Sequence, residues 1–92
     1  MSKLNAQEIT TRLAALPEWR IEEGVLTRTF SFKDFVASLA FVNRVGERAE
    51  AAGHHPDIDI RYDHVKLALV THDAGGLTAK DFNLATVADG LI

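Results

Sequence analysis

Apolar residues recur along the chain with two different periods, and the changes of period mark out its elements. Ile9 and Leu13 fall at helical spacing near the start. Asn5 and Glu8 before them have the spacing of a capping box, in which the Asn side chain accepts from an early amide and the Glu reaches back. Pro17 cannot continue a helix, so the pattern predicts a first helix that ends just before it.

Two short β-prone runs follow, over residues 19–21 and 25–30. They flank a turn that contains Gly24, and the second run alternates apolar and polar positions. Such a pair predicts a β-hairpin with one half-buried face.

A long helix is predicted next, over about residues 32–52. Ser31 with Asp34 has the spacing of a helix start, Gly53 is a natural C-terminal stop, and Pro56 prevents continuation. Its apolar positions recur at helical spacing through Phe35, Leu39, Val42, Gly46 and Ala49.

A second hairpin is predicted after the long helix. Apolar and charged residues alternate over residues 57–62, and residues 65–71 are apolar and β-branched, with Asp63-His64 as the turn between them. A loop over residues 73–77 then leads to Thr78 and Asp81, which resemble a third helix start.

The predicted order is therefore α-β-β-α-β-β-α. Two hairpins segregated from the helices indicate an α+β fold, most simply a four-stranded antiparallel sheet with three helices packed on one face. The length of 92 residues fits a single domain over residues 1–92.

Composition narrows the classes of function. The net charge is −3 and no basic patch stands out, which argues against direct nucleic-acid binding. The absence of cysteine excludes disulfides, zinc-thiolate sites and thiol catalysis. No apolar run approaches ~18 residues and no signal core is present, so we expect a cytoplasmic protein without membrane contact.

Candidate chemistry gathers around a His-His-Pro sequence. Imidazole groups in general titrate near pH ~6.5 and can both give and take protons at neutral pH. Nearly all of the candidates fall at ends of predicted elements, where side chains converge on pockets. The candidate set is Glu50, His54, His55, Pro56, Tyr62, His72 and Asp81.

Simpler explanations stay open for several of these residues. His54 fits a cation at a helix C-terminus, and Asp81 fits a helix cap. Glu50 fits a solvated helix position. His64 fits a turn and is left out of the set. The rival chemical interpretation is a site for zinc or a similar ion with the ligands His54, His55, Asp57 and His72. The spacing matches no metal signature, and we expect no metal and no cofactor.

The combined spacing resembles the signature of the pterin-4a-carbinolamine dehydratases. Three residues separate Glu50 from His54-His55-Pro56, five more precede Tyr62, nine precede His72, and eight precede Asp81. Further stretches that resemble this family are Leu16 to Trp19, Phe30 to Phe41 and Gly76 to Ala85.

The resemblance implies a lyase without a cofactor, and specifically a 4a-hydroxytetrahydrobiopterin dehydratase. The reaction converts 4a-hydroxytetrahydropterin to quinonoid dihydropterin, which supports cofactor recycling for aromatic amino acid hydroxylases. It also implies a homodimer or homotetramer.

The resemblance further implies roles for single residues. His54 and His72 would be the general acids at the hydroxyl, with His55 and Pro56 at the substrate. Glu50 and Asp81 would relay protons. Trp19 would contact the pterin ring.

Two other functions remain open at this point. Relatives of the family include a dimerisation cofactor of a transcription factor and proteins proposed to assist assembly of a carbon-fixing enzyme, so a non-catalytic binding module is the alternative. The third hypothesis is a dehydratase or binding protein for a different pterin, as in molybdenum cofactor metabolism.

Overall fold

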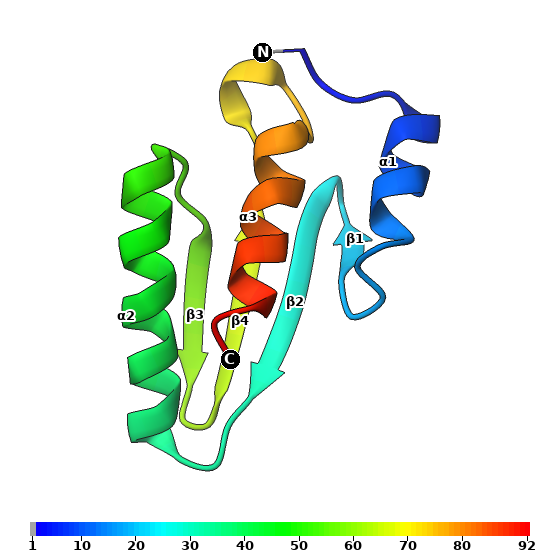
Figure 1. Ribbon diagram of the computed structural model, residues 1–92. Helices are drawn as coiled ribbons and strands as arrows, with labels where there is room; N and C mark the ends of the chain where they lie inside the picture. Colours follow the sequence, from blue (N-terminus) through cyan, green and yellow to red (C-terminus); the bar gives the residue numbers. More distant parts are fainter. Residues whose placement is uncertain (1) are drawn as a thin grey trace.

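The strands form a single four-stranded antiparallel sheet in the order β1-β2-β4-β3 (Figure 1). The computed structural model describes residues 2–92. The strands are β1 (Arg20–Glu22), β2 (Val25–Ser31), β3 (Asp57–Arg61) and β4 (His64–Leu69). The helices are α1 (Ala6–Leu13), α2 (Phe35–Ala52) and α3 (Ala79–Asp89), with a short 3₁₀ turn η1 (His72–Ala74).

The predicted α+β fold and the order α-β-β-α-β-β-α are confirmed. Helices α2 and α3 stand side by side against one face of the sheet, and α1 lies beyond them beside β1 (Figure 1). α1 has no fully buried residue, but Ile9 and Leu13 pack against the core. Its capping box between Asn5 and Glu8 is present as predicted.

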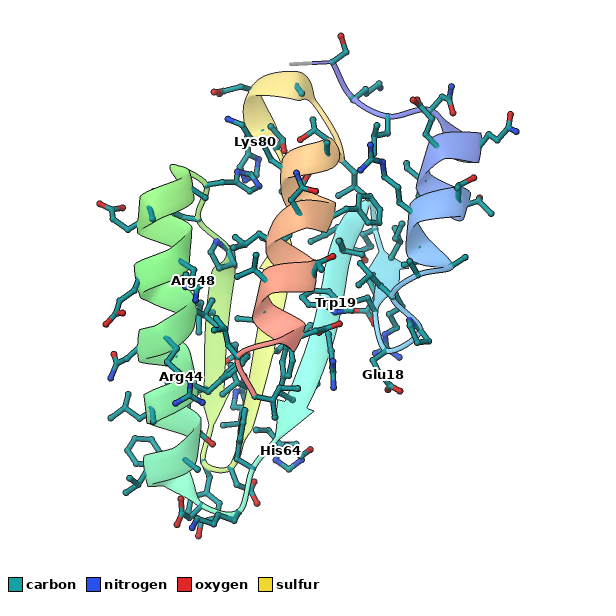
Figure 2. All side chains as sticks on the ribbon, in the orientation of Figure 1. Glu18, Trp19, Arg44, Arg48, His64 and Lys80 are labelled. Carbon is teal, nitrogen blue, oxygen red and sulfur yellow. The ribbon has the colours of Figure 1, made fainter. Side chains whose placement is uncertain are left out.

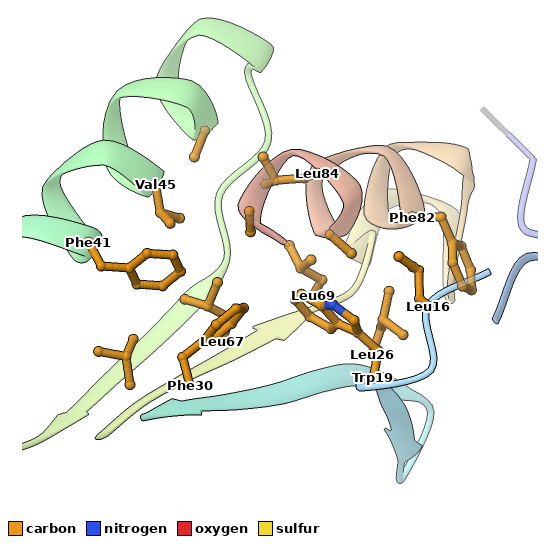
Figure 3. Close-up of a cluster of buried hydrophobic side chains, with 14 of the residues drawn as sticks. Leu16, Trp19, Leu26, Phe30, Phe41, Val45, Leu67, Leu69, Phe82 and Leu84 are labelled. Atoms are coloured by element: carbon orange, nitrogen blue, oxygen red, sulfur yellow. The ribbon is translucent and has the colours of Figure 1, made fainter. Parts of the chain in front are cut away.

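The core lies between the sheet and the helices α2 and α3 (Figure 3). Phe30 from β2 meets Phe41 from α2 with ring centroids 4.6 Å apart, and Trp19 meets the Phe30 ring edge-on at 5.9 Å. Alternate residues of β4 point into this layer, including the fully buried Val65 and Leu67. The core thereby fixes the relative positions of α3 and the end of β4, which carry the candidate site.

The predicted start of the long helix is wrong by three residues. Ser31 is the last residue of β2, and Asp34 is the N-cap, whose side chain accepts from the amide of Ala37. Ser31 pairs with His64 across the sheet. Because the ladder holds Ser31, the chain can turn into the helix only after it.

The face of α2 that is buried also differs from the apolar stripe seen in the sequence. The buried positions are Ser38, Phe41, Val45 and Ala49, whereas Phe35 and Leu39 are 46% and 41% exposed. α2 carries apolar residues around more than half of its circumference. The sheet covers the stripe that contains Phe41, and the neighbouring stripe faces outward.

The turn of the second hairpin is shifted by one residue from the prediction. Arg61 pairs with His64, so the two turn residues are Tyr62 and Asp63, and Tyr62 takes a left-handed φ of 55°. Two-residue hairpin turns with positive φ match the twist of the flanking strands, which explains the choice. β4 ends at Leu69, and Thr71 beyond it forms an isolated bridge to Gly76.

Candidate active site

An adjacent pair of histidines, His54 and His55, and the distant His72 line one hollow at the end of the sheet. The hollow has a volume of about 250 Å³ and lies between the loop after α2 and the segment from β4 into η1. We call it the histidine hollow. Its lining includes Gly53, His54, His55, Thr71, His72 and Lys80. The structure therefore brings together the three histidines that the sequence singled out.

Gly53 sets the direction in which the chain leaves α2. It adopts a left-handed conformation with φ of 63° at the C-cap, which glycine reaches without the penalty that a Cβ imposes. The amide of His54 then donates to the carbonyl of Ala49 at 3.1 Å. The backbone of His54, rather than its ring, caps the helix, and the ring is left free for another partner.

That partner is Asp81, in the first turn of α3. The Nε2 atom of His54 lies 2.6 Å from Oδ1 of Asp81. The Asp81 side chain is fully buried, and the His54 side chain is only 11% exposed. A carboxylate accepts, so Nε2 carries the proton and Nδ1 is the ring nitrogen left for a ligand.

The second carboxylate oxygen of Asp81 is held by two threonines. Oδ2 accepts from the hydroxyl of Thr71 at 2.8 Å and from the amide of Thr78 at 2.9 Å. The hydroxyl of Thr78 lies 2.8 Å from that of Thr71, and it must be the donor because the proton of Thr71 points to Asp81. Asp81 therefore caps α3 with one oxygen and orients His54 with the other.

Thr71 and Thr78 were not identified as site residues from the sequence. Thr78 was recognised only as a helix cap, which it is. Thr71 gave no signal beyond its position next to His72. A buried carboxylate that needs several donors could have indicated them, but the burial of Asp81 was itself not visible in the sequence.

His55 faces solvent and forms a pair with Glu50. Its Nε2 lies 2.6 Å from Oε1 of Glu50, and the two side chains are 63% and 79% exposed. An exposed pair of this kind contributes little to stability, about 0–1 kcal/mol. The pair instead orients the His55 ring at the rim of the histidine hollow.

His72 is the first residue of η1 and is exposed. Within residues 2–92, no side chain holds its ring by a hydrogen bond. The Thr71 side chain next to it is fixed by Asp81, so the backbone at this point is anchored while the imidazole can turn. His72 is thus the most adjustable of the three rings.

One of the predicted residues, Trp19, lies away from the histidine hollow. Trp19, expected to contact a pterin ring, is 4% exposed and donates from Nε1 to Asp89 at 2.8 Å. Asp89 follows Asp81 by eight residues, about 12 Å along α3. Figure 2 shows Trp19 beside the lower half of α3, opposite the end that carries Lys80. The structure places Trp19 in the core, not at the hollow.

Pro56 and Tyr62 also lie outside the hollow. Pro56 is half-buried in the loop between α2 and β3, where it restricts the backbone that follows the histidine pair. Tyr62 is 68% exposed in the turn at the far end of β3. Its place in the spacing pattern therefore reflects the hairpin turn.

No group of three or more His, Cys, Asp or Glu side chains within residues 2–92 is arranged to hold a metal ion. Across the same residues, no helix has the length and apolar character needed to cross a membrane.

Comparison with known proteins matches residues 2–91 to the family described as pterin 4 alpha carbinolamine dehydratase. The chain belongs to this family. A relative from Acidobacterium capsulatum is 55% identical over the full length of both chains. One from Chloroflexus aurantiacus is 54% identical over all of this chain and 99% of its own. Both carry the name pterin-4-alpha-carbinolamine dehydratase as a provisional assignment.

Solved structures of the dehydratase family share the fold. A crystal structure from Brucella melitensis, described as a transcriptional coactivator/pterin dehydratase, aligns with a TM-score of 0.94 at 30% identity over 98% of both chains. A pterin dehydratase-like RuBisCO assembly factor of the alpha-carboxysome aligns with a TM-score of 0.65 at 22% identity over 79% of this chain and 84% of its own. The second match shows the fold alone. Family membership thus supports dehydratase activity on a pterin carbinolamine.

Proposed function

We propose that residues 1–92 form one dehydratase domain that removes the hydroxyl of a 4a-hydroxytetrahydropterin as water. The observation that supports this most directly is the histidine hollow, in which His54, His55 and His72 line one space and His54 is anchored by the buried Asp81. The family resemblance adds the pterin as substrate. It also supports recycling of the cofactor of aromatic amino acid hydroxylases as the physiological role.

The reaction needs two proton transfers and no change of oxidation state. The bond from C4a to oxygen breaks as a proton reaches the hydroxyl, and a proton leaves the neighbouring ring nitrogen to give the quinonoid dihydropterin. General acid–base catalysis by positioned side chains typically contributes ~10²–10⁴-fold to such steps. The imidazoles of the histidine hollow are suited to both transfers.

The three histidines differ in their partners, which supports different roles. We assign His54 as an acid at the hydroxyl because Asp81 fixes its ring and offsets the positive charge that a doubly protonated ring carries. His72, adjustable and exposed, is the second acid. His55, held at the rim by Glu50, would orient the pterin and pass protons to solvent.

Single substitutions at the two proposed acids test this assignment. A 4a-hydroxytetrahydropterin is generated in situ, and the loss of its absorbance is followed with wild type, His54→Ala and His72→Ala. We expect each variant to be slower by ~10-fold or more. The lower bound is set below the usual ~10²–10⁴-fold contribution of general acid–base catalysis, because the second histidine remains in each variant. Circular dichroism checks that both variants fold. Wild-type rates in both folded variants would remove the histidines from the mechanism.

We also propose that the chain assembles with copies of itself through the outer side of α2 and the edge strand β3. β3 pairs on one side only, and an open edge is a template for a further strand. Apolar side chains lie exposed beside it, with Val36 at 74%, Leu39 at 41% and Ile58 at 38%. A second copy would bury this apolar surface, and the resemblance to a family of dimers and tetramers supports that occupant.

The oligomer is tested by light scattering of the wild type and of Leu39→Glu. The wild type should be a dimer or tetramer at micromolar concentration, and the glutamate should shift it to monomer. The control Thr11→Glu, at an exposed position of α1, should leave the assembly intact. A monomeric wild type would overturn the proposal.

The same outer surface would serve the alternative function, a non-catalytic binding or assembly module. The names of the coactivator and assembly-factor relatives motivate this alternative. The variant His72→Ala distinguishes the two functions. A scaffold would still bind its partner after this substitution, whereas a dehydratase would dehydrate the pterin more slowly. The anchored histidine set favours the dehydratase, because a binding surface on α2 and β3 does not require the hydrogen bond between Asp81 and the His54 ring.

A further inference from the structure

A second hollow lies on the other side of His54, between α2 and α3. It has a volume of about 350 Å³ and shares His54 and Lys80 with the histidine hollow. We call it the interhelix groove. Since both spaces border the same two side chains, they are neighbours that meet at His54 and Lys80.

The walls of the interhelix groove are apolar where the two helices face each other. Ala51 comes from the last turn of α2, and Leu84 and Val87 come from α3 at helical spacing. The short side chain of Ala51 leaves room that a larger residue would fill. A surface of this kind favours a flat or aliphatic group.

Positive charge lines the same groove. Arg48 projects from α2 and Lys80 from the first turns of α3, and no Asp or Glu side chain is among the lining residues. No ion pair within residues 2–92 engages either cation. Figure 2 shows Arg44 and Arg48 on the side of α2 that faces α3, and Lys80 at the start of α3. Lys80 also lines the histidine hollow. In a chain of net charge −3, this local excess of cations indicates an anionic ligand.

We propose that the interhelix groove is a subsite for the substituent of the pterin, and that the preferred substrate carries an extended substituent that ends in an anion. This proposal rests on the proposed function, because it places the pterin ring in the histidine hollow. The apolar wall would contact the middle of the substituent. Arg48 would bind the terminal carboxylate or phosphate, with Lys80 beside the ring end.

Binding of stable dihydropterins tests the subsite. Dissociation constants are measured by calorimetry for three 7,8-dihydropterins that share one ring. They carry a neutral dihydroxypropyl group, a phosphorylated hydroxyalkyl group, or a p-aminobenzoylglutamate group. We expect at least one anionic compound to bind ~10-fold more tightly than the neutral one, a difference of about 1.4 kcal/mol. The anionic compound with the lower dissociation constant identifies phosphate or carboxylate as the natural end group.

Arg48→Gln and a matched control assign the preference to the groove. Arg48→Gln should raise the dissociation constant of the preferred anionic compound toward that of the neutral one. Arg12→Gln, which removes the same charge from an exposed position of α1, should leave both constants unchanged. Equal binding of neutral and anionic compounds by the wild type would overturn the subsite, as would a preference that Arg48→Gln leaves intact.

Failure of the subsite is distinguishable from failure of the dehydratase. Wild-type turnover of the neutral 4a-hydroxytetrahydropterin depends on the histidine hollow alone. A wild type that dehydrates this compound but shows no anion preference would contradict only the subsite. A wild type that dehydrates none of the three 4a-hydroxy compounds would contradict the dehydratase, and the subsite with it.

Discussion

Asp81 and His54 are joined by a hydrogen bond of 2.6 Å although they lie 27 positions apart in the sequence. The aspartate is fully buried, and each of its oxygens has a separate task. Oδ1 accepts from His54, while Oδ2 accepts from the amide of Thr78 and completes the cap of α3. The orientation of a proposed catalytic ring is thereby tied to the start of a helix.

Replacing Asp81 with Asn should impair both tasks. The asparagine amide has one oxygen, which accepts, and one NH₂ group, which donates. If the NH₂ group faces His54 it meets the protonated Nε2, and if it faces Thr71 and Thr78 it meets their hydroxyl and amide donors. In either orientation one hydrogen bond of the aspartate is replaced by two donors that face each other. We expect the free energy of unfolding to fall by about 1.5–3 kcal/mol, the usual value of hydrogen bonds to a charged group. The dehydration rate should fall by ~10-fold or more. Chemical denaturation and the rate assay measure the two effects.

A double-mutant cycle separates these two effects. If Asp81 acts on the rate through the His54 ring, Asp81→Asn should add little to the loss in rate already caused by His54→Ala. Rate losses that simply multiply would contradict a role of Asp81 through His54.

Removing the hydroxyl of Thr71 should loosen the Asp81 carboxylate. Thr71→Val keeps the shape of the side chain but leaves Asp81 Oδ2 with one donor fewer and the Thr78 hydroxyl without its acceptor. A cost of about 1–3 kcal/mol in the free energy of unfolding is expected for such unpaired groups. The pH dependence of the dehydration rate should shift as well, since Asp81 then holds His54 differently.

Thr71→Ser is the matched control, because serine restores the hydroxyl. It should recover most of the stability and the wild-type pH profile. If serine and valine behaved alike, packing of the Thr71 methyl group would explain the loss, and the hydroxyl would have no positioning role.

Gly53 should be intolerant of alanine. Its φ of 63° lies where a Cβ is strained, at a cost of roughly 1–2 kcal/mol. Any adjustment of this residue would also move His54 and His55, so Gly53→Ala should lower the melting temperature and the dehydration rate together. Asparagine tolerates the left-handed region better than alanine. Gly53→Asn should therefore lie between wild type and Gly53→Ala in both measurements.

Trp19 should matter for stability and not for the pterin. Trp19→Phe removes the donor to Asp89, and Asp89 keeps its contact with Arg28 at 2.7 Å. We expect a loss of about 1–3 kcal/mol in the free energy of unfolding, with the Michaelis constant of the folded fraction unchanged. A raised Michaelis constant at wild-type stability would instead support the ring contact that the family resemblance implies.

Local signals in the sequence predicted most ends of the elements, except that α1 ends at Leu13 rather than just before Pro17. The capping boxes at Asn5 and Thr78 and the glycine stop at Gly53 depend on short-range contacts, and all three are present. The start of α2 was predicted too early because Ser31 and Asp34 both fit a cap. The pairing of Ser31 with His64 decides between them, and such a pairing is not visible in a local pattern.

The site was predictable as a set of residues and not as a set of contacts. Spacing identified the three histidines and Asp81, but the sequence could not decide whether Asp81 caps a helix or faces a histidine. Both are true, since a carboxylate has two oxygens. The burial of Trp19 was not predictable, because a tryptophan at the start of a strand is compatible with either a pocket or a core. Its hydrogen bond to Asp89 joins residues 70 positions apart in the sequence.

The dehydration rate of a variant that lacks both proposed acids shows whether His54 and His72 carry out the proton transfer. Loss of the 4a-hydroxyl from a freshly generated neutral 4a-hydroxytetrahydropterin is timed with wild type and with the double variant His54→Ala/His72→Ala, at equal concentrations of folded protein. We expect a loss of ~10²-fold or more, which brings the rate close to that of the uncatalysed reaction. A folded double variant that still dehydrates the pterin at the wild-type rate would exclude both histidines as the acids.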